Sequence, residues 1–358
     1  MTTEAETATA KEIYSKLNAR KVLFVIIGLS GLVALTLVAA SIGSADLGAG
    51  NLARALAARI FPFLDIGVSD KVDAIFWDIR LPRIVMGIIA GAGLAVSGTA
   101  MQGIMRNPLV SPFTLGISSA AAFGASIAIV LGVGMVGSEK YIITTNAFVF
   151  AVLAMFLVYG LARIRGMRPE TLILSGIALM YFFSAATSVL QYIATEEEVH
   201  AVVHWLFGTL TGASWENILV VFIIFACCLP FLIKYSWDLN AMIAGDEVAT
   251  TLGVNTRRVR IVCMVLATLV TAGIICFTGI IGFVGLVAPH ITRMMIGADH
   301  RFLLPCSCIL GALLLLGADT LGRTAFQPVI IPVGIVISVI GVPFFLYLIL
   351  RTRREYFQ

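Results

Sequence analysis

The sequence predicts an all-α, polytopic membrane protein with about ten transmembrane helices. Hydrophobic residues make up 59% of the 358 residues and charged residues only 12%, whereas a soluble domain carries about a quarter charged residues. The mean hydropathy is +1.01. The apolar residues fall into runs of about twenty, which is the length a helix needs to cross ~30 Å of hydrocarbon.

The first apolar run covers residues 22–42 and follows a polar segment at 1–21. A signal peptide is the competing interpretation, because Ala39-Ala40-Ser41 resembles a cleavage site. The run is longer than the usual signal-peptide core of about 7–15 residues. We therefore expect a retained first span with a cytoplasmic N-terminal tail at 1–21.

Residues 43–79 form a polar excursion that includes a possible surface helix from Leu47 to Ile60. The remaining spans are expected at 81–104, 113–136, 142–163, 171–194, 216–234, 259–281, 283–297, 302–322 and 330–350. The run at 283–297 is short and contains Pro289, which predicts a partial or re-entrant helix broken at the proline. The chain then has one transmembrane domain, 22–350, and a cytoplasmic C-terminal tail, 351–358.

The basic residues test this count, because loops on the cytoplasmic side of a membrane carry an excess of Lys and Arg. Ten crossings put most of the 24 basic residues inside, and they leave the others outside: Arg54, Arg59, Lys71, Arg80, Arg83, Lys140 and Arg323. Glu196, Glu197, Glu198 and the aspartates of 43–79 also fall outside. Omitting the short span would move Arg351, Arg353 and Arg354 outside, so the charge asymmetry favours keeping it.

A weak internal repeat is also present. Arg83-Ile84-Val85 recurs as Arg260-Ile261-Val262, and at the same offset Pro112 corresponds to Pro289. An odd number of spans separates the copies, so they would cross the membrane in opposite senses. Inverted repeats of this kind are a common plan of transporters.

The stretch from Leu239 to Arg260 is a polar island between two spans. Asp246 and Glu247 come early, Ala249 and Leu252 lie on one side, and Gly253 follows as a stop signal. Acids in the first turn and a glycine at the C-cap predict a short amphipathic helix. We interpret the island as the place where a soluble partner acts on the membrane domain.

Two further segments indicate structural or gating roles. Between the second and third spans, Asn107 precedes Pro108 and a second proline follows at 112, which predicts a rigid turn. Glycines at 282 and 285 lead to Pro289 and His290, a pattern that allows close backbone approach. The residues we assign to these roles are Met101, Gln102, Asn107, Pro108, Pro112, Gly282, Gly285, Pro289 and His290.

Two charged patterns allow alternative interpretations. His200 and His204 have metal-ligand spacing on a helix, but a solvated outer loop and surface helix is the favoured interpretation, because nothing else in the sequence supports a metal site. Asp319 and Arg323 are four residues apart, so they form either a local ion pair or part of a docking site. Together with Arg80 and Arg83, Arg323 is an arginine on the side where basic residues are disfavoured, which suggests an acidic external partner.

Several function classes are disfavoured. The sequence contains no G-x-x-x-x-G-K-[ST] loop, so this chain does not bind ATP through a P-loop. Acidic residues at mid-membrane depth are lacking, which gives a proton or sodium relay little support. Lys/Arg clusters with interleaved aromatics are also lacking, so a nucleic-acid partner is not expected.

At these residues the sequence resembles the FecCD family of permeases in ABC importers for iron-siderophores, haem and vitamin B12. The resemblance runs from Arg80 onward and rests on ordered blocks. These are Arg80-Leu81-Pro82-Arg83, Met101-Gln102, Asn107-Pro108-Leu109, Leu115-Gly116, Trp205-Leu206-Phe207-Gly208, Gly245-Asp246-Glu247 with Ala249 and Leu252-Gly253, and Gly282 to Leu286 with Pro289-His290.

The resemblance implies a homodimer in the cell membrane, with both termini cytoplasmic, two ATP-binding subunits inside and a substrate-binding protein outside. It implies that Gly245, Asp246, Glu247, Ala249, Leu252 and Gly253 couple to the ATPase. It also implies that Arg80, Arg83 and Arg323 dock the binding protein, and that the spans near 171–194 and 330–350 gate the path. We expect no catalytic residue, metal or cofactor in this chain, because ATP and Mg²⁺ would belong to the partner.

A ferric siderophore is the substrate expected first, with corrinoid and haem as alternatives. An ion-gradient secondary transporter is the alternative class, and an intramembrane metal enzyme built on His200 and His204 is a third. The acidic run at Glu196–Glu198 is not explained by the resemblance.

Overall fold

The computed structural model describes residues 2–43, 48–61, 63, 67–134 and 141–351, and within these ranges the chain is helical without strands. The long and intermediate helices are α1 (Thr2–Ser41), α2 (Ala49–Ile60), α4 (Leu81–Met105), α5 (Ile117–Leu131), α6 (Ile142–Ile164), α7 (Pro169–Ile193), α8 (Glu196–Leu206), α9 (Trp215–Lys234), α12 (Thr256–Thr278), α13 (Val284–Ile296), α14 (His300–Thr324) and α15 (Val333–Arg351). The short ones are α3 (Asp70–Ala74), the π-helical η1 (Ile75–Arg80), the 3-10 segment η2 (Pro112–Leu115), α10 (Ser236–Ile243) and α11 (Asp246–Thr251).

The ten apolar helices expected from the sequence are all present. In the described ranges, 7 helices are long and apolar enough to cross a membrane, and the shorter apolar helices are Ile117–Leu131, Val284–Ile296 and Val333–Tyr347. The short span predicted at 283–297 is therefore confirmed as a helix. The predicted surface helix is α2, which begins at Ala49; Leu47 lies outside the described residues, as do Lys140, Arg353 and Arg354.

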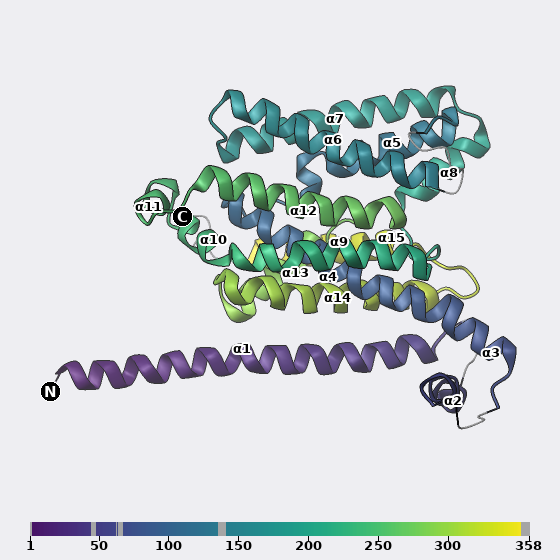
Figure 1. Ribbon diagram of the computed structural model, residues 1–358, viewed down its shortest axis with the longest axis horizontal. Helices are drawn as coiled ribbons and strands as arrows, with labels where there is room; N and C mark the ends of the chain where they lie inside the picture. Colours follow the sequence, from purple (N-terminus) through teal and green to yellow (C-terminus); the bar gives the residue numbers. More distant parts are fainter. Residues whose placement is uncertain (1, 44–47, 62, 64–66, 135–140, 352–358) are drawn as a thin grey trace.

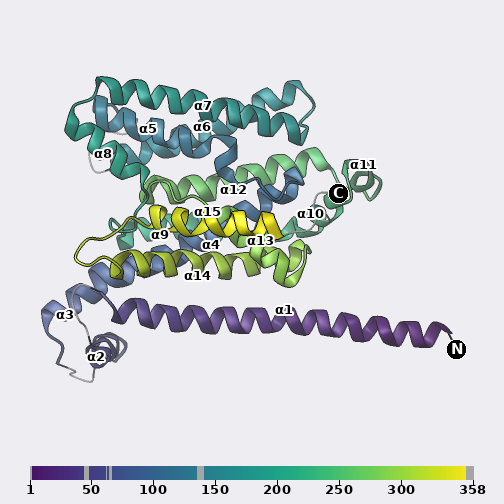
Figure 2. The same ribbon diagram turned by 180° about the vertical axis from the view of Figure 1, so that it is seen from behind.

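The helices form a bundle with α4 at its centre and α1 along one flank (Figures 1 and 2). Helix α4 is mostly buried, whereas the apolar part of α1 is mostly exposed. Helices α5, α6 and α7 form a layer on the side of the bundle opposite α1. A helix buried inside a membrane bundle approaches its neighbours closely only if its contact residues are small, and α4 is rich in Gly, Ala, Ser and Thr between Gly87 and Gly103.

The two ends of the bundle are different. Helices α10 and α11 lie at one end, here called the α11 end, and α2 and α3 lie at the other, here called the α3 end (Figures 1 and 2). Helix α1 starts at the α11 end, and α15 runs back toward it. The expected even number of crossings therefore agrees with the described fold.

The short amphipathic helix predicted within 239–260 is present as α11, but it occupies only part of that stretch. The segment contains α10, a break, α11 and the first turn of α12, which already includes the predicted arginines from Arg257 to Arg260. The breaks lie at Gly245 (φ +109°) and Gly253 (φ +86°), backbone conformations that are accessible to glycine and strained for other residues. The predicted acids in the first turn and the glycine stop are confirmed for α11.

The predicted break at Pro289 is also wrong, because α13 continues through the proline. Proline has no N–H to donate to the carbonyl four residues earlier, which here belongs to Gly285. That carbonyl instead packs directly on Gly98 of α4, where an added Cβ would lie only 1.7 Å from the oxygen. A close Cα–H···O approach of this kind can accommodate a carbonyl without a conventional donor.

Helices α4 and α12 are antiparallel. The start of α12 reaches the end of α4, where Nε of Arg260 donates a hydrogen bond to the carbonyl of Ile104 at 3.1 Å. These two helices carry the Arg-Ile-Val repeat, and their opposite senses agree with the inverted repeat expected from the sequence.

Candidate functional site

The segment Gly245–Gly253 presents a mixed surface at the α11 end. Ala249 is fully buried in the main core, whereas Val248 is 45% and Leu252 68% exposed. Glu247 is exposed as well. Ala249 therefore holds α11 to the bundle, whereas Glu247, Val248 and Leu252 offer a carboxylate and two apolar side chains to the surroundings.

Asp246 points inward, unlike its neighbour Glu247. Both of its carboxylate oxygens accept hydrogen bonds from Nη2 of Arg260, at 2.6 and 2.8 Å. Nη2 of Arg106 lies 3.8 Å from the same carboxylate. Partial burial opposes ionisation, but the hydrogen bond from Arg260 and the charges of Arg260 and Arg106 hold the pKa of Asp246 below its ordinary value.

A second polar network ties α10 to the start of α14. Nδ2 of Asn240 donates to Asp299 at 2.7 Å, while Oδ1 of Asn240 accepts from the backbone N–H of His300 at 2.8 Å. Arg301 binds Asp299 through Nε and Nη2 and stacks over the Trp237 ring, 4.2 Å from its centroid. The hydrogen bond from Arg301, opposed by partial burial, lowers the pKa of Asp299 to about 2.

The turn after α4 has the rigidity predicted for Asn107-Pro108. Arg106 adopts a left-handed conformation (φ +50°), and Oδ1 of Asn107 accepts the Leu109 N–H at 2.9 Å. Pro112 then starts the 3-10 segment that precedes α5. The turn is therefore fixed by both the side chain of Asn107 and the prolines.

The predicted gating residues of α4 and α13 come together at mid-bundle and toward the α11 end. Met101 is fully buried, and the neighbouring Gln102 accepts a hydrogen bond from Nη2 of Arg293 in α13 at 2.8 Å. Gly285 contacts Gly98, and the half-buried His290 lies edge-on to Phe345 of α15, with ring centroids 6.2 Å apart. Gly282 lies in the connection before α13, where a Cβ would meet no atom within 4 Å.

At the α3 end, the arginines predicted to dock an external partner are buried. Arg83 donates to Asp319 through Nε and Nη2 at 2.9–3.1 Å, and Nε of Arg323 donates to the same carboxylate at 3.1 Å. Arg323 also reaches the carbonyl of Ala39 at 3.2 Å, and Arg80 donates to the carbonyls of Ala40 and Ser41. All of these side chains are less than 10% exposed.

The local ion pair offered by the sequence for Asp319 and Arg323 is therefore present, and Arg83 joins it. The network ties α4 and α14 together and fastens the end of α1 to both. A docking role for these arginines stays a prediction, and it would require a partner to reach side chains that the fold already pairs. No sequence pattern predicts the Arg83–Asp319 contact, because 236 residues separate the two.

The histidines at i, i+4 lie on α8. Thr195 caps this helix through a reciprocal capping box with Glu198, which gives that acid a structural role. His200 and His204 are both exposed. In the described part of the chain no group of three or more His, Cys, Asp or Glu side chains could hold a metal ion.

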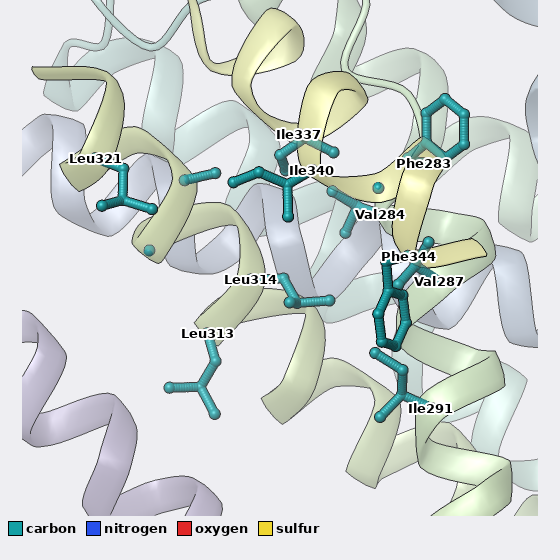
Figure 3. Close-up of a pocket in the computed structure, with 13 residues that line it drawn as sticks. Phe283, Val284, Val287, Ile291, Leu313, Leu314, Leu321, Ile337, Ile340 and Phe344 are labelled. Carbon is teal, nitrogen blue, oxygen red and sulfur yellow. The ribbon is translucent and has the colours of Figure 1, made fainter. Parts of the chain in front are cut away.

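An apolar pocket of about 320 Å³ lies between α13, α14 and α15 (Figure 3). Val287 of α13 lines the pocket, together with Phe283, which directly precedes that helix. Leu314 of α14 and Ile337 and Ile340 of α15 line the other sides. The lining side chains are all apolar, and a water molecule needs two to four polar partners to be held in a cavity. The pocket is therefore not a site for a charged ligand.

Comparison with known proteins gives consistent matches over most of the chain. A sequence model of the FecCD transport family matches residues 31–351. A cobalamin import system permease protein of Halobacterium salinarum is 42% identical over 293 residues, which cover 81% of this chain and 77% of the relative. A hemin transport system permease protein of Yersinia pestis is 38% identical over 327 residues, covering 91% and 96%.

The fold has a close counterpart among solved structures. An inward-facing structure of a transporter assigned to the metal-chelate ABC type matches with a TM-score of 0.79 and 34% sequence identity. The match covers 91% of this chain and 98% of that chain.

Proposed function

The chain belongs to the FecCD transport family, and from this premise we propose that it is the transmembrane permease subunit of an ABC importer for a metal chelate. A transport role agrees with a bundle of apolar helices that crosses the membrane repeatedly. The relatives named as permease proteins of import systems support the same assignment.

The observation that carries the proposal is the exposed face of α11. Val248 and Leu252 are apolar and uncovered at one end of a membrane bundle, next to the carboxylate of Glu247. Exposed apolar side chains grouped beside a charge are typical of a protein contact. Because the sequence has no P-loop, the energy source is another chain, and α11 is the proposed seat of an ATP-binding subunit that holds ATP and Mg²⁺.

The charges support an orientation. The side expected to be cytoplasmic carries several arginines at the ends of spans: Arg106, Arg163, Arg168, Arg257 and Arg258. Helix α11 lies in a connection on that same side. We propose that the α11 end faces the cytoplasm together with both termini. The α3 end then faces outward and receives the substrate-binding protein.

A second copy of the chain is the remaining partner that we propose. Helices α7 and α15 expose large apolar side chains, including Phe182 and Val189 on α7 and Val339 and Leu346 on α15. The resemblance to the family favours a homodimer with a path between the two copies, gated near these helices. Gly282, Gly285, Pro289 and His290, in and before α13, would contribute to that gate.

The substrate proposal is a metal chelate. A ferric siderophore remains the first expectation, and corrinoid or haem transport is the alternative, supported by relatives named for cobalamin and for hemin.

The test is reconstitution of the full complex in proteoliposomes, with the ATP-binding subunits and the substrate-binding protein encoded beside the chain. We expect uptake of a radiolabelled ferric siderophore, hemin or cobalamin to require ATP inside the cytoplasmic compartment and the binding protein outside. Vesicles with an ATPase subunit that cannot hydrolyse ATP are the control. Uptake that needs no ATPase and follows an imposed ion gradient would support the secondary-transporter alternative and contradict the proposal.

A further inference from the structure

We propose that Arg260 is a positioning residue that joins α11 to the end of α4, so that displacement of α11 is transmitted to the centre of the bundle. This inference rests on the proposed function, in which α11 receives the ATP-binding subunit. It assigns the transmission to one buried guanidinium on α12, rather than to the residues that face the ATPase.

The side chain of Arg260 contacts two other helices at once. Nη2 donates to both carboxylate oxygens of Asp246, the first residue of α11, at 2.6 and 2.8 Å. Nε donates to the carbonyl of Ile104, in the last turn of α4, at 3.1 Å. The side chain is only 4% exposed. A planar guanidinium holds its donors in a fixed arrangement, so the three helices meet at one rigid group.

The carbonyl of Ile104 needs this donor. In a continuing helix it would accept a hydrogen bond from the residue four positions later, which is Pro108 and has no N–H. The neighbouring carbonyls of Gln102 and Gly103 accept from the N–H groups of Arg106 and Asn107. Arg260 therefore satisfies a carbonyl that the proline turn leaves without a partner, and this fixes where α4 ends.

Asp246 and Glu247 have different roles in this arrangement. The carboxylate of Asp246 is directed toward Arg260, with Arg106 as a second cation at 3.8 Å, whereas Glu247 is exposed beside Val248. Asp246 thus holds α11 to the bundle, and its neighbours form the surface available to a partner. The two acids, although adjacent, should affect different measurements.

The end of α4 is linked onward to α13. Gln102, one turn before the end of α4, accepts a hydrogen bond from Arg293 of α13 at 2.8 Å. Further along, the Gly285 carbonyl of α13 packs on Gly98 of α4. A shift of the α4 end that follows Arg260 would therefore reach α13, the short helix beside α15.

The experiment measures substrate molecules taken up per ATP hydrolysed in proteoliposomes of the full complex. Asp246→Asn and Arg260→Lys each remove part of the guanidinium–carboxylate contact, and Lys cannot reproduce the fork that reaches Ile104. We expect uptake per ATP to fall about tenfold in either variant, a change that corresponds to about 1.4 kcal/mol. The double variant should be no worse than Arg260→Lys alone, because a pair acting as one unit is non-additive.

Arg258→Lys is the matched control, since Arg258 lies two residues away on the same helix and is exposed; its uptake per ATP should equal that of the wild type. Glu247→Gln should instead weaken binding of the ATPase subunit to the permease. If the melting temperature and the complex yield of Asp246→Asn fall in parallel with uptake per ATP, the contact only holds the fold together, and the inference is overturned.

Unchanged uptake per ATP in Asp246→Asn, or additive losses in the double variant, would overturn the inference while leaving the proposed function intact. A wild-type complex that shows no ATP-dependent uptake would instead contradict the proposed function.

Discussion

Arg83 and Asp319 are 236 residues apart in the chain, and yet the Arg83 guanidinium forms a bidentate contact with the Asp319 carboxylate at 2.9–3.1 Å. Arg323 donates to the same carboxylate. One buried acid therefore holds two cations between α4 and α14, and it lies where these helices meet the end of α1. A charge buried without a partner is strongly unfavourable, so this acid governs the stability of the α3 end.

Asp319→Asn should destabilise the protein severely. The variant leaves two buried guanidinium groups without their counter-charge, and breaking a buried ion pair in this way costs about 3–5 kcal/mol. The measurement is the thermal unfolding midpoint of the purified protein in detergent, with the exposed Asp78→Asn as control. A midpoint equal to that of the control would show that the network does not stabilise the fold.

Docking of a binding protein by Arg83 can be separated from this structural role. If an acid of the partner contacts Arg83 directly, Arg83→Gln should weaken binding-protein affinity, whereas Asp319→Asn, which frees the arginine, should not. If the network acts only by holding the fold, both variants should lose affinity in proportion to the folded fraction. Binding is measured by surface plasmon resonance on protein held in nanodiscs and corrected for that fraction.

Gly98→Ala should separate α4 from α13. An added Cβ would lie 1.7 Å from the Gly285 carbonyl oxygen, so the helices must move apart, and overpacking of this kind costs about 1–3 kcal/mol. Gly160→Ala on α6 is the matched control, because a Cβ there meets no atom within 4 Å. A helix-interior alanine at 160 should stabilise by about 0.5–1 kcal/mol. Equal unfolding midpoints for the two variants would contradict the close contact.

Asp299 should make stability depend on pH at the acidic end. Its pKa is lowered from 3.8 to about 2, so the carboxylate binds protons more readily in the unfolded state. Its contribution is present above about pH 4 and is lost as pH falls toward 2. Unfolding followed between pH 5 and 2 should show a steeper loss for the wild type than for Asp299→Asn. Parallel curves would exclude a role for the Asn240–Asp299–Arg301 contacts.

Leu252 and Ala249 should have separable effects although both belong to the predicted coupling motif. Leu252→Ala removes an exposed apolar side chain, and since burying a leucine contributes about 1.5–3 kcal/mol, affinity for the ATPase subunit should fall about tenfold or more. Ala249→Leu inserts volume into the core and should lower the unfolding midpoint instead. Unaltered ATPase affinity in Leu252→Ala would argue against α11 as the contact.

The sequence determined the membrane class, the ten apolar helices and their approximate limits. These features depend on local properties, since the hydrophobic length of a run decides whether a helix can span the bilayer. The glycine stop at 253 and the Asn107-Pro108 turn were predictable from the residue types themselves. The short helix at 283–297 was retained because of the charge asymmetry between the loops. The family also followed from ordered motifs, and it is confirmed by the match over residues 31–351.

The predicted break at Pro289 failed because it concerned a backbone group whose partner lies elsewhere in the fold. Pro289 does not break α13, because the carbonyl it leaves free is received by Gly98 on another helix. The contact that receives the Gly285 carbonyl is not encoded within one helical turn of Pro289, because Gly98 belongs to another helix. At 239–260 the predicted short helix is present as α11, and the structure adds α10 before it, with a break at Gly245 (φ +109°).

Only the tertiary structure decided which charges meet. Arg80, Arg83 and Arg323 look like external cations in the sequence and are buried donors in the fold, while Asp246 turns toward Arg260 and away from its neighbour Glu247. A buried charge must find its partner within a few ångströms, and the packing of α4 against α12, α13 and α14 supplies that partner from distant parts of the chain. The sequence therefore specified the helices, and their close packing specified the ion pairs at both ends of the bundle.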